Sequence, residues 1–412
     1  MKIRIFKFEK YNFNPKTGIV VFEYELSAAR HENNLKFKER LIFPMKGVDF
    51  QEVNKEAFDK ALFNLFLIAG ISYYKIYCPK KIDLGKYKLT GEQAKFWNKV
   101  YTKGLGEFFY KNKIDYRGLV KFPYDKNYQA STTEIKIGKK YLVPLGGGKD
   151  SIVALEMLRE QKKDFDLMSV RDLKIVRDAA KVAHKKLLII ERQIDSKLLK
   201  LNNKKGVYNG HIPFNAYLAF ISLAAAILYD YQFIVLANES SANRGNVKYL
   251  GQIINHQYSK SAEFEKDFQK YIAEFITPSI KYYSILRSLN ELKITKKFVQ
   301  YKKYFPVFSS CNDNFKLGKQ AKKRWCGECS KCVFVWTMLS AYLPKKELIK
   351  IFCQNLYAKK ELKDTFLLLL GRKGFKPFEC VGTPWEMKMA MRLAQEEGEY
   401  NGDIIMKEFK KI

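Results

Sequence analysis

The sequence has no long hydrophobic run. Its longest apolar stretch, Ala216–Tyr229, has 14 residues and is interrupted only by Ser222. A helix that spans a bilayer needs about 20 apolar residues, so we expect no membrane span. The opening MKIRIFKFEK alternates charged and apolar residues and lacks a signal-peptide core. Hydrophobic residues make up 47% of the 412 residues, which excludes global disorder. We therefore expect a folded cytoplasmic protein.

Arginine is scarce although the chain is strongly basic. Only 13 of the 75 basic residues are Arg, and the formal net charge is +32. Proteins that read nucleic acid directly use Arg, whose planar guanidinium pairs with phosphates and guanines. Here Lys is scattered over the whole chain, so we expect no stable nucleic-acid partner. A basic surface still attracts polyanionic substrates, including nucleotide-linked metabolites.

Hydrophobic periodicity divides the chain into three predicted regions. Residues 1–137 begin with three stretches of alternating apolar and polar residues and continue with two helical patterns. This order predicts an N-terminal α+β accessory or substrate domain. Residues 138–304 alternate short apolar runs with helical stretches, which predicts an α/β fold, a parallel sheet with helices on both faces. Residues 305–412 contain most of the cysteines and helical patterns, and are predicted to form a helical lobe.

A glycine-rich loop follows the first strand of the predicted parallel sheet. Three glycines allow close backbone approach, and the helix that follows directs free N–H groups at the loop, as a phosphate site requires. Asp150 is predicted to hold a magnesium ion that bridges the phosphates. The loop is not a Walker A motif, which has Ser or Thr directly after its Lys. The predicted nucleotide-binding residues of this loop are Gly146, Gly147, Gly148, Lys149, Asp150 and Ser151.

This strand, loop and helix resemble the S-G-G-x-D-S motif of the PP-loop ATP pyrophosphatases, which have the adenine nucleotide alpha hydrolase-like fold. That resemblance implies cleavage of ATP between its α and β phosphates and adenylation of a substrate oxygen. Gly146 stands where the family has its first Ser, so one hydroxyl contact to the phosphates is missing. An ordinary glycine-rich turn is the alternative interpretation of the loop.

The cysteines favour a metal site over disulfides. Seven cysteines are present, an odd number, and three of them have C-x2-C-x2-C spacing. Four thiolates around one ion are typical of structural zinc, and an iron–sulfur cluster is the alternative. The predicted ligands are Cys311, Cys326, Cys329 and Cys332.

Seven stretches, taken together in their order along the chain, resemble those of a more specific family. The chain is distantly similar to 7-cyano-7-deazaguanine synthase, a PP-loop enzyme with a late four-cysteine zinc site. It resembles much more closely, over nearly its whole length, the MurL family of ATP-dependent UDP-N-acetylmuramoyl-L-alanyl-L-glutamate epimerases. The stretches are PLGGGKDS (144–151), NGHIPFNAYLAFISLAAA (209–226), LANESSANRGN (236–246), INHQYSKSAEFEKDF (254–268), YFPVFSSCN (304–312), RWCGECSKCVFV (324–335) and KPFECVG (376–382).

The resemblance implies that the terminal L-glutamate of a UDP-muramoyl dipeptide is converted to D-glutamate in peptidoglycan synthesis. The Cα proton beside a carboxylate anion is hardly acidic. An acyl-adenylate removes that charge and lets the carbanion delocalise as an enolate. ATP, magnesium and zinc are the cofactors implied, and AMP and pyrophosphate are the products.

The matching stretches also supply candidates for proton transfer. A general base must lie within hydrogen-bond reach of the proton that it takes. The candidates are His211, Glu239, His256 and Cys380, and each also has a purely structural interpretation. Glu239 could equally be a second magnesium ligand. Asn238 and Arg244 are also predicted to contact the nucleotide. Asn238 lies just past the carboxyl end of a predicted strand, and the charge of Arg244 suits a phosphate or carboxylate.

Two other classes of function compete with the epimerase. An RNA-modifying PP-loop enzyme, such as one that thiolates tRNA, agrees with the net charge and the cysteines. The scarcity of Arg and the lack of a visible RNA-binding module count against it. A non-catalytic zinc module that binds nucleic acid has no use for a phosphate loop. The sequence makes no prediction of oligomeric state.

Overall fold

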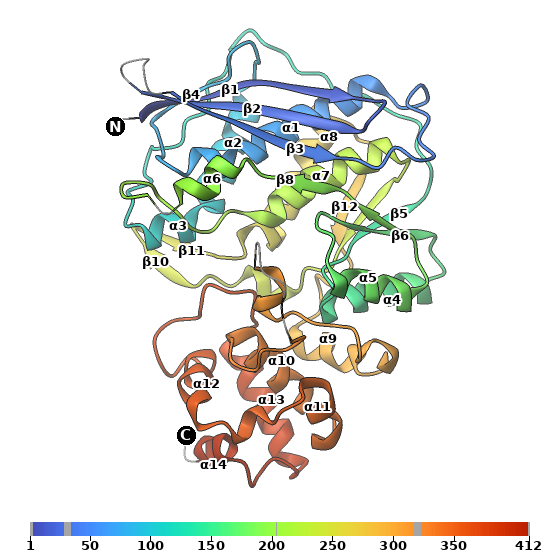
Figure 1. Cartoon of the computed structure of the whole chain (residues 1–412), viewed down its shortest axis with the longest axis vertical. Helices are drawn as coiled ribbons and strands as arrows, with labels where there is room; N and C mark the ends of the chain where they lie inside the picture. Colours follow the sequence, from blue (N-terminus) through green and yellow to red (C-terminus); the bar gives the residue numbers. More distant parts are fainter. Residues whose placement is uncertain (1–2, 29–33, 203, 317–320, 322, 411–412) are drawn as a thin grey trace.

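The computed structural model describes residues 3–28, 34–202, 204–316, 321 and 323–410. A five-stranded sheet, built mainly from the N-terminal part of the chain, has the order β4-β1-β2-β3-β8 (Figure 1). Neighbouring strands pair antiparallel, except that β4 pairs with β1 in parallel. Phe6 and Phe8 of β1 are buried, whereas residues between the buried positions are partly exposed, as the alternating sequence predicts. The strands are β1 (Ile3–Asn14), β2 (Ile19–Ala28), β3 (Leu35–Ile42), β4 (Lys81–Asp83) and β8 (Glu191–Gln193).

A second, fully parallel sheet follows in the order β12-β9-β5-β6-β7. This confirms the predicted parallel α/β unit, and four of its strands lie where the apolar runs place them. The fifth strand, β12, was not predicted because its sequence KYYS is short and half polar. The strands are β5 (Tyr141–Pro144), β6 (Phe165–Ser169), β7 (Leu187–Ile189), β9 (Phe233–Leu236) and β12 (Lys281–Ser284).

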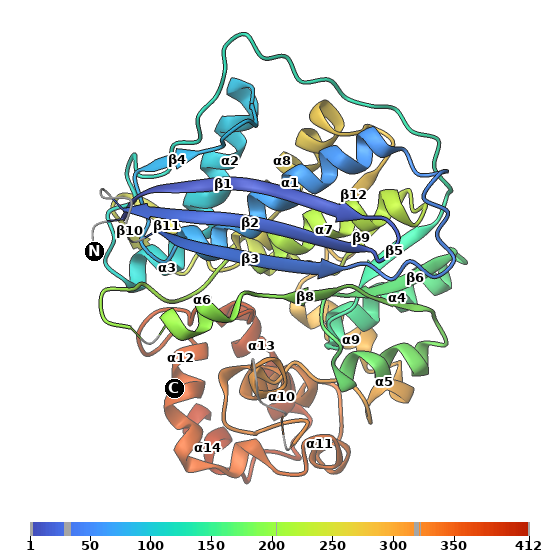
Figure 2. The ribbon, with the colours of Figure 1, turned by 45° about the horizontal axis from the view of Figure 1, so that its top comes forward.

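Helix α7 (Phe214–Leu228) explains the longest apolar run. It packs against α1 (Lys55–Tyr74) on one side and contacts β5 and β9 on the other, so it lies between the two sheets (Figure 2). Twelve of its residues are buried, which requires apolar residues all round the helix. One hydrophobic core therefore extends from β1 through α1 and α7 to one face of the parallel sheet. Among the described residues, no helix is long and apolar enough to cross a membrane.

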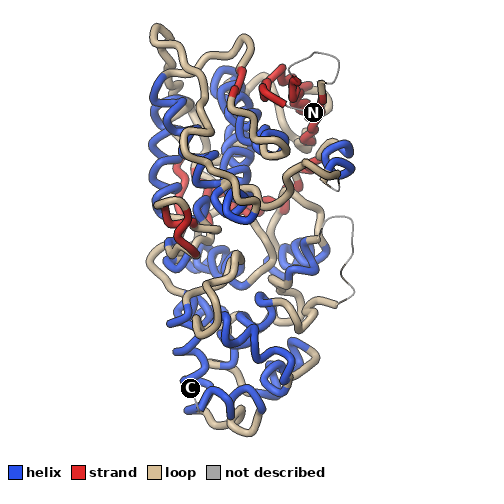
Figure 3. The backbone as a smooth tube through the Cα atoms, turned by 90° about the vertical axis from the view of Figure 1, so that its left-hand side faces the viewer, coloured by secondary structure: helices blue, strands red, loops and turns tan. Residues whose placement is uncertain are grey.

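The C-terminal residues form a helical lobe at the lower end of the molecule in Figure 1. Its core is continuous with the other face of the parallel sheet through α4 and α9, so lobe and sheet share one set of buried side chains. Figure 3 shows that helices and loops make up this end of the chain. The remaining elements are α2 (Gly91–Gly104), α3 (Gly106–Lys111), α4 (Lys149–Glu160), α5 (Lys174–Ala183), α6 (Ser196–Leu201), β10 (Val247–Tyr249), β11 (Gln252–Ile254), η3 (Tyr258–Lys260), α8 (Ala262–Phe275), α9 (Glu291–Phe298), α10 (Ser330–Ser340), α11 (Lys345–Phe352), α12 (Lys363–Leu369), α13 (Pro384–Glu396) and α14 (Ile404–Lys410).

Candidate active site

The candidate site lies where the strand order of the parallel sheet reverses. The chain moves from β5 outward to β6 and β7, then returns to β9 on the other side of β5. In open parallel sheets, ligands bind beyond the carboxyl ends of the strands at this switch point. The glycine loop follows β5, and Asn238 and Glu239 follow β9. The sheet therefore brings together two segments that the sequence analysis selected separately.

The glycine loop has the backbone geometry of an anion site. Gly147 has φ +79°, a conformation that favours glycine, and its carbonyl accepts a 3.0 Å hydrogen bond from the Ser309 N–H. Helix α4 begins at Lys149, and its N-cap Gly148 supplies no capping side chain, so the first N–H groups of the helix have no side-chain acceptor there. The Ser151 hydroxyl donates to the Gly148 carbonyl at 3.0 Å. A phosphate at this helix end would accept from the N–H groups.

Gly146 and Gly147 differ in whether the structure has room for a side chain, so alanine substitutions at the two positions can be compared directly. A Cβ on Gly147 would be held at positive φ and would lie 3.3 Å from the Ile175 carbonyl oxygen, whereas a Cβ on Gly146 meets nothing within 4 Å. We expect Gly147→Ala to lower the free energy of unfolding by about 1–2 kcal/mol. Gly146→Ala should change it by less than about 0.5 kcal/mol. Urea unfolding of both variants measures the difference, and equal destabilisation would contradict it.

Three carboxylates converge next to this loop. Asp150, Glu239 and Glu291 each place one oxygen within 4.8 Å of the others. Glu239 and Glu291 are buried. Asp150 was predicted as a magnesium ligand, and Glu239 was predicted for proton transfer with a second magnesium ligand as the alternative; both lie in this cluster. Glu291 was missed, because after Asn290 it looks like an ordinary acidic residue in the first turn of a capped helix.

Buried lysines offset only part of this negative charge. The Lys149 ammonium contacts both Asp150 and Glu291, and the Lys260 ammonium lies 3.8 Å from a Glu239 oxygen. Burial raises the pKa of Glu291 to about 8, with neighbouring carboxylates adding to the effect of burial and Lys149 opposing it. That oxygen, Oε2 of Glu239, has no partner within hydrogen-bond distance in the described part of the chain. A buried carboxylate oxygen without a donor fits a site for a hard cation such as Mg²⁺.

The other two predicted nucleotide contacts have different surroundings. Asn238 is buried, and its backbone N–H donates to the Ser284 hydroxyl at 2.8 Å, so the chain direction after β9 is fixed. Arg244 is exposed at the end of a short 3-10 helix. Lys149 was predicted to contact phosphate, and its ammonium lies in the carboxylate cluster.

A second cluster contains the other three candidates for proton transfer. Nδ1 of His256 lies 2.5 Å from a Glu107 carboxylate oxygen, and Nε2 of His256 lies 3.9 Å from Cys380 Sγ. Nδ1 of His211 lies 3.6 Å from the same Glu107 oxygen, and the two imidazole rings are 4.5 Å apart. Glu107 was missed by sequence reasoning, because it lies in α3 of the N-terminal region, which contains no recognisable motif.

The four cysteine sulfurs are spaced as ligands of one ion. Cys311 and Cys329 sulfurs are 4.0 Å apart, those of Cys326 and Cys332 are 3.7 Å apart, and those of Cys329 and Cys332 are 3.6 Å apart. A disulfide would bring two sulfurs to about 2.05 Å. Tetrahedral ligands about 2.3 Å from a zinc ion lie about 3.8 Å from one another, so the spacing fits.

The cysteine cluster is connected to both other clusters. Ser309, two residues before Cys311, donates its N–H to the Gly147 carbonyl of the glycine loop. Lys331, between Cys329 and Cys332, donates to the Cys380 carbonyl. A metal ion here would therefore fix the segments that hold the glycine loop and Cys380.

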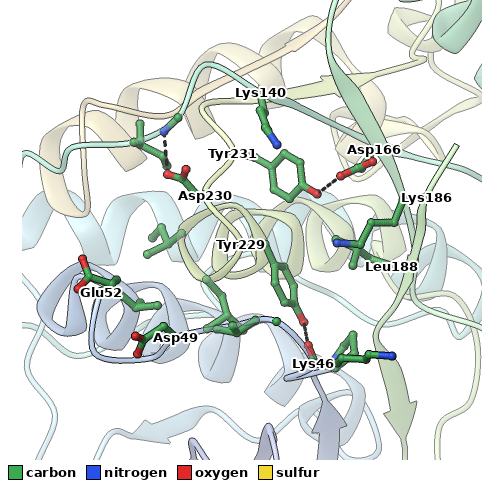
Figure 4. Close-up of a pocket in the computed structure, with 18 of the residues that line it drawn as sticks. Lys46, Asp49, Glu52, Lys140, Asp166, Lys186, Leu188, Tyr229, Asp230 and Tyr231 are labelled. Atoms are coloured by element: carbon green, nitrogen blue, oxygen red, sulfur yellow. Dashed lines mark hydrogen bonds between the residues drawn. The ribbon is translucent and has the colours of Figure 1, made fainter.

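A large cavity lies at the opposite edge of the parallel sheet and is separate from this site (Figure 4). It has a volume of about 1350 Å³, and Lys140, Asp166 and Lys186 line it at the amino ends of β5, β6 and β7. Two of its acidic side chains have partners: Tyr231 donates to Asp166 at 2.5 Å, and Asp230 accepts from the Gly138 N–H at 2.7 Å. The cavity contains none of the predicted catalytic residues.

Two family models cover most of the chain. The model described as the MurL N-terminal domain matches residues 1–285, and the model described as the MurL C-terminal domain matches residues 307–412. Three curated relatives are each named UDP-N-acetyl-alpha-D-muramoyl-L-alanyl-L-glutamate epimerase. The protein from Xanthomonas oryzae pv. oryzae is 33% identical over 410 residues, which cover 99% of this chain and 89% of that relative. The proteins from Micromonospora sp. and Salinispora tropica are each 34% identical, over 96% and 95% of this chain and 88% and 85% of their own lengths. The chain belongs to the MurL family.

Proposed function

We propose that the chain converts the terminal L-glutamate of UDP-N-acetylmuramoyl-L-alanyl-L-glutamate to D-glutamate in peptidoglycan precursor synthesis. The reaction passes through an acyl-adenylate and releases AMP and pyrophosphate. The observation that carries the proposal is the convergence, at the switch point of the parallel sheet, of a phosphate-type glycine loop with Asp150, Glu239 and Glu291. The names of the relatives support the substrate. Because ATP and nucleotide-linked precursors are cytoplasmic metabolites, the proposal also places the enzyme in the cytoplasm.

Activation of the substrate carboxylate accounts for the use of ATP. An ionised carboxylate opposes the formation of a second negative charge at Cα. Attack of that carboxylate on the α-phosphorus of ATP breaks the α–β anhydride, releases pyrophosphate and gives a neutral acyl group. The Cα proton then becomes acidic enough for a side-chain base. Hydrolysis of the mixed anhydride after inversion yields the D-glutamyl product and AMP.

The glycine loop and the carboxylates would share the nucleotide. N–H groups at the start of α4 and the backbone of Gly147 face the position of the phosphates. Asp150, Glu239 and Glu291 would hold magnesium, which when bound neutralises charge on the phosphates. Lys149 already pairs with Asp150 and Glu291, so it holds these carboxylates in place.

An unpaired buried cation supports a substrate that carries carboxylates. Nζ of Lys376 is buried and has no hydrogen-bond partner among the described residues. Burial lowers the pKa of Lys376, and the charges of Glu239 and Cys380 oppose that shift, so its ammonium faces both clusters. A buried, unpaired charge is costly. We assign Lys376 to a carboxylate of the glutamyl residue.

The cysteine cluster has a structural role in this proposal. Four closely spaced sulfurs suit one tetrahedral zinc ion with no open position for substrate. The zinc would hold the loop around Ser309 against the phosphate loop.

The test is direct. Purified full-length protein is incubated with ATP, Mg²⁺ and the UDP-muramoyl dipeptide, and D-glutamate is measured after acid hydrolysis with AMP and pyrophosphate. We expect D-glutamate only when ATP is present, and AMP formation that depends on the dipeptide. Epimerisation at the same rate without nucleotide would contradict the acyl-adenylate. AMP formation that depends on tRNA and not on the dipeptide would favour RNA modification instead.

A further inference from the structure

Glu107, His256 and Cys380 form a line that ends at a thiol. His256 lies between the other two: its Nδ1 contacts the Glu107 carboxylate at 2.5 Å, and its Nε2 lies 3.9 Å from Cys380 Sγ. Lys111 donates to the other Glu107 oxygen at 2.5 Å, which fixes the carboxylate. One ring nitrogen of His256 therefore faces Glu107 and the other faces Cys380. In this orientation the imidazole can stabilise a negative charge on the Cys380 sulfur.

The charges around the thiol favour its thiolate. Lys260 from η3, Lys331 from α10 and Lys376 from the loop before α13 surround Cys380, together with His256. Burial alone would raise the pKa of Cys380, but Lys260, His256 and Lys331 lower it to about 6. A thiolate is thus present at neutral pH.

The imidazole carries the matching positive charge. Burial opposes the charge on His256, but Cys380 and Glu107 outweigh burial and raise its pKa to about 9. His211, which also faces Glu107, has a pKa lowered by burial to about 3 and stays neutral. The pair at neutral pH is therefore a thiolate and an imidazolium.

The Lys260 ammonium interacts electrostatically with both the Cys380 thiol and the carboxylate cluster, where activation of the substrate is proposed. Its ammonium is 3.8 Å from Glu239 in the carboxylate cluster, and its charge is the strongest of those that lower the pKa of Cys380. Asp150 and Glu291 act on the same ammonium. The thiolate thus lies beside the site where an acyl-adenylate would form.

Building on the proposed function, we propose that Cys380 is the catalytic residue that takes the Cα proton of the adenylated glutamyl residue on one face, with His256 and Glu107 as positioning residues. The proton moves from Cα to Sγ, and the electron pair of the C–H bond delocalises onto the acyl oxygen as an enolate. A proton that arrives on the opposite face forms the inverted C–H bond.

The distance between Cys380 and His256 shows that these two side chains act on the same face of the glutamyl Cα. Groups that act from opposite sides of a carbon each approach to about 3–3.5 Å, so they lie about 6–7 Å apart. Cys380 Sγ and His256 Nε2 are only 3.9 Å apart. The proton for the opposite face therefore comes from a different group.

Two other roles for the cluster fit the geometry less well. Glu107, His211 and His256 have potential metal-ligand atoms within 4.8 Å of one another. However, two ligands about 2.0–2.2 Å from one tetrahedral or octahedral ion lie about 3 Å or more apart, and the Glu107–His256 contact is 2.5 Å. If Cys380 instead attacked the acyl-adenylate, the thiolate would be consumed while His256 kept its proton. Only the weakly basic His211 and the paired Glu107 carboxylate would then remain in the cluster to act on Cα.

The experiment separates proton transfer from activation. Full-length wild type and Cys380→Ser are incubated with ATP, Mg²⁺ and the dipeptide in D₂O, and AMP release and deuterium at the glutamyl Cα are measured separately. We expect Cys380→Ser to lose deuterium incorporation by about 10³-fold and to keep AMP release within about threefold. Cys353→Ser, at an exposed cysteine, is the control and should match wild type in both readouts.

Each contradictory outcome has a distinct meaning. Deuterium incorporation by wild type without ATP contradicts the proposed function. Incorporation by Cys380→Ser at the wild-type rate contradicts the assignment of Cys380. A hydroxylamine-labile adduct of substrate mass on Cys380 of wild type, detected by mass spectrometry, would make Cys380 a nucleophile and overturn its role as base. The test without ATP and the search for an adduct both use wild-type protein, so their results do not depend on whether a variant folds.

The pH dependence tests the positioning residues. The thiolate forms above pH about 6 and the imidazolium is lost above pH about 9, so kcat/KM for epimerisation should fall on both sides of this window. Glu107→Gln removes a charge that raises the pKa of His256, so the alkaline limb should move to lower pH. A merely structural role of Glu107 would lower the rate at every pH without moving that limb, which would contradict the assignment.

Discussion

Asp150→Asn is expected to reduce dipeptide-dependent AMP release by about 10³-fold, which corresponds to about 4 kcal/mol of transition-state stabilisation. The variant keeps the shape of the side chain but removes the charge that would hold Mg²⁺ against the phosphates. Lys149 keeps its contact with Glu291, and loss of the Asp150 charge, which raises the pKa of Glu291, favours the ionised form of that remaining partner. Far-UV circular dichroism and the Tm should therefore stay close to those of wild type while AMP release, measured by chromatography, is lost.

A matched control lies on the same helix. Glu160 is at the exposed end of α4, remote from the glycine loop, and Glu160→Gln should release AMP at the wild-type rate. Glu239→Gln should resemble Asp150→Asn, because Oε2 of Glu239 is buried and has no hydrogen-bond donor. Near-normal AMP release by Asp150→Asn would show that the metal assignment is wrong.

The sequence predicted the parts of this site that depend on local pattern. The glycine loop, the strands on either side of the switch point and the four cysteines are each short segments whose spacing has a direct physical reason. Periodicity placed β5 and β9 correctly, so the meeting of Gly147 with Glu239 at one sheet edge followed from topology. Such features need no knowledge of distant contacts.

The residues that were missed depend on distant contacts. Glu107 lies in a helix of the N-terminal region and reaches His256 across 149 positions in the sequence. Glu291 enters the carboxylate cluster because α9 packs against α4. Neither has a local signal, since an acidic residue near a helix N-terminus is ordinary. Glu239 was predicted for proton transfer because its position after β9 did not show which cluster it would face.

The predicted boundary at residue 137 illustrates a related limit of reasoning from sequence. Alternating strands predict an N-terminal unit of 137 residues, but α1 of that unit and α7 of the next region pack together within one hydrophobic core. Shared burial of this kind cannot be seen in hydrophobic periodicity, which reports only that both helices are apolar. The boundary at 137 stays a prediction. The shared core explains how α3 can supply Glu107 to a cluster built mainly from later segments.

The second large effect concerns the cysteine cluster. Cys329→Ser should remove the zinc, lower the Tm by more than about 10 °C and raise the KM for ATP. Structural zinc contributes many kcal/mol to folding, and Cys311 and Cys332 are part of the core that joins the lobe to the parallel sheet. The Ser309 N–H that holds the Gly147 carbonyl is two residues from Cys311, so the phosphate loop loses support before the protein unfolds. Metal analysis, thermal unfolding and initial rates measure the three effects.

The same measurements distinguish zinc from its alternatives. We expect about one zinc per chain in wild type, because four sulfurs 3.6–4.0 Å apart surround room for a single ion. Cys353→Ser should keep its zinc and its Tm, because Cys353 is exposed at the end of α11 and outside the cluster. Iron and acid-labile sulfide in place of zinc would contradict the assignment of the ion. An unchanged KM for ATP in zinc-depleted protein that is still folded would show that the cluster stabilises the lobe without supporting the phosphate loop.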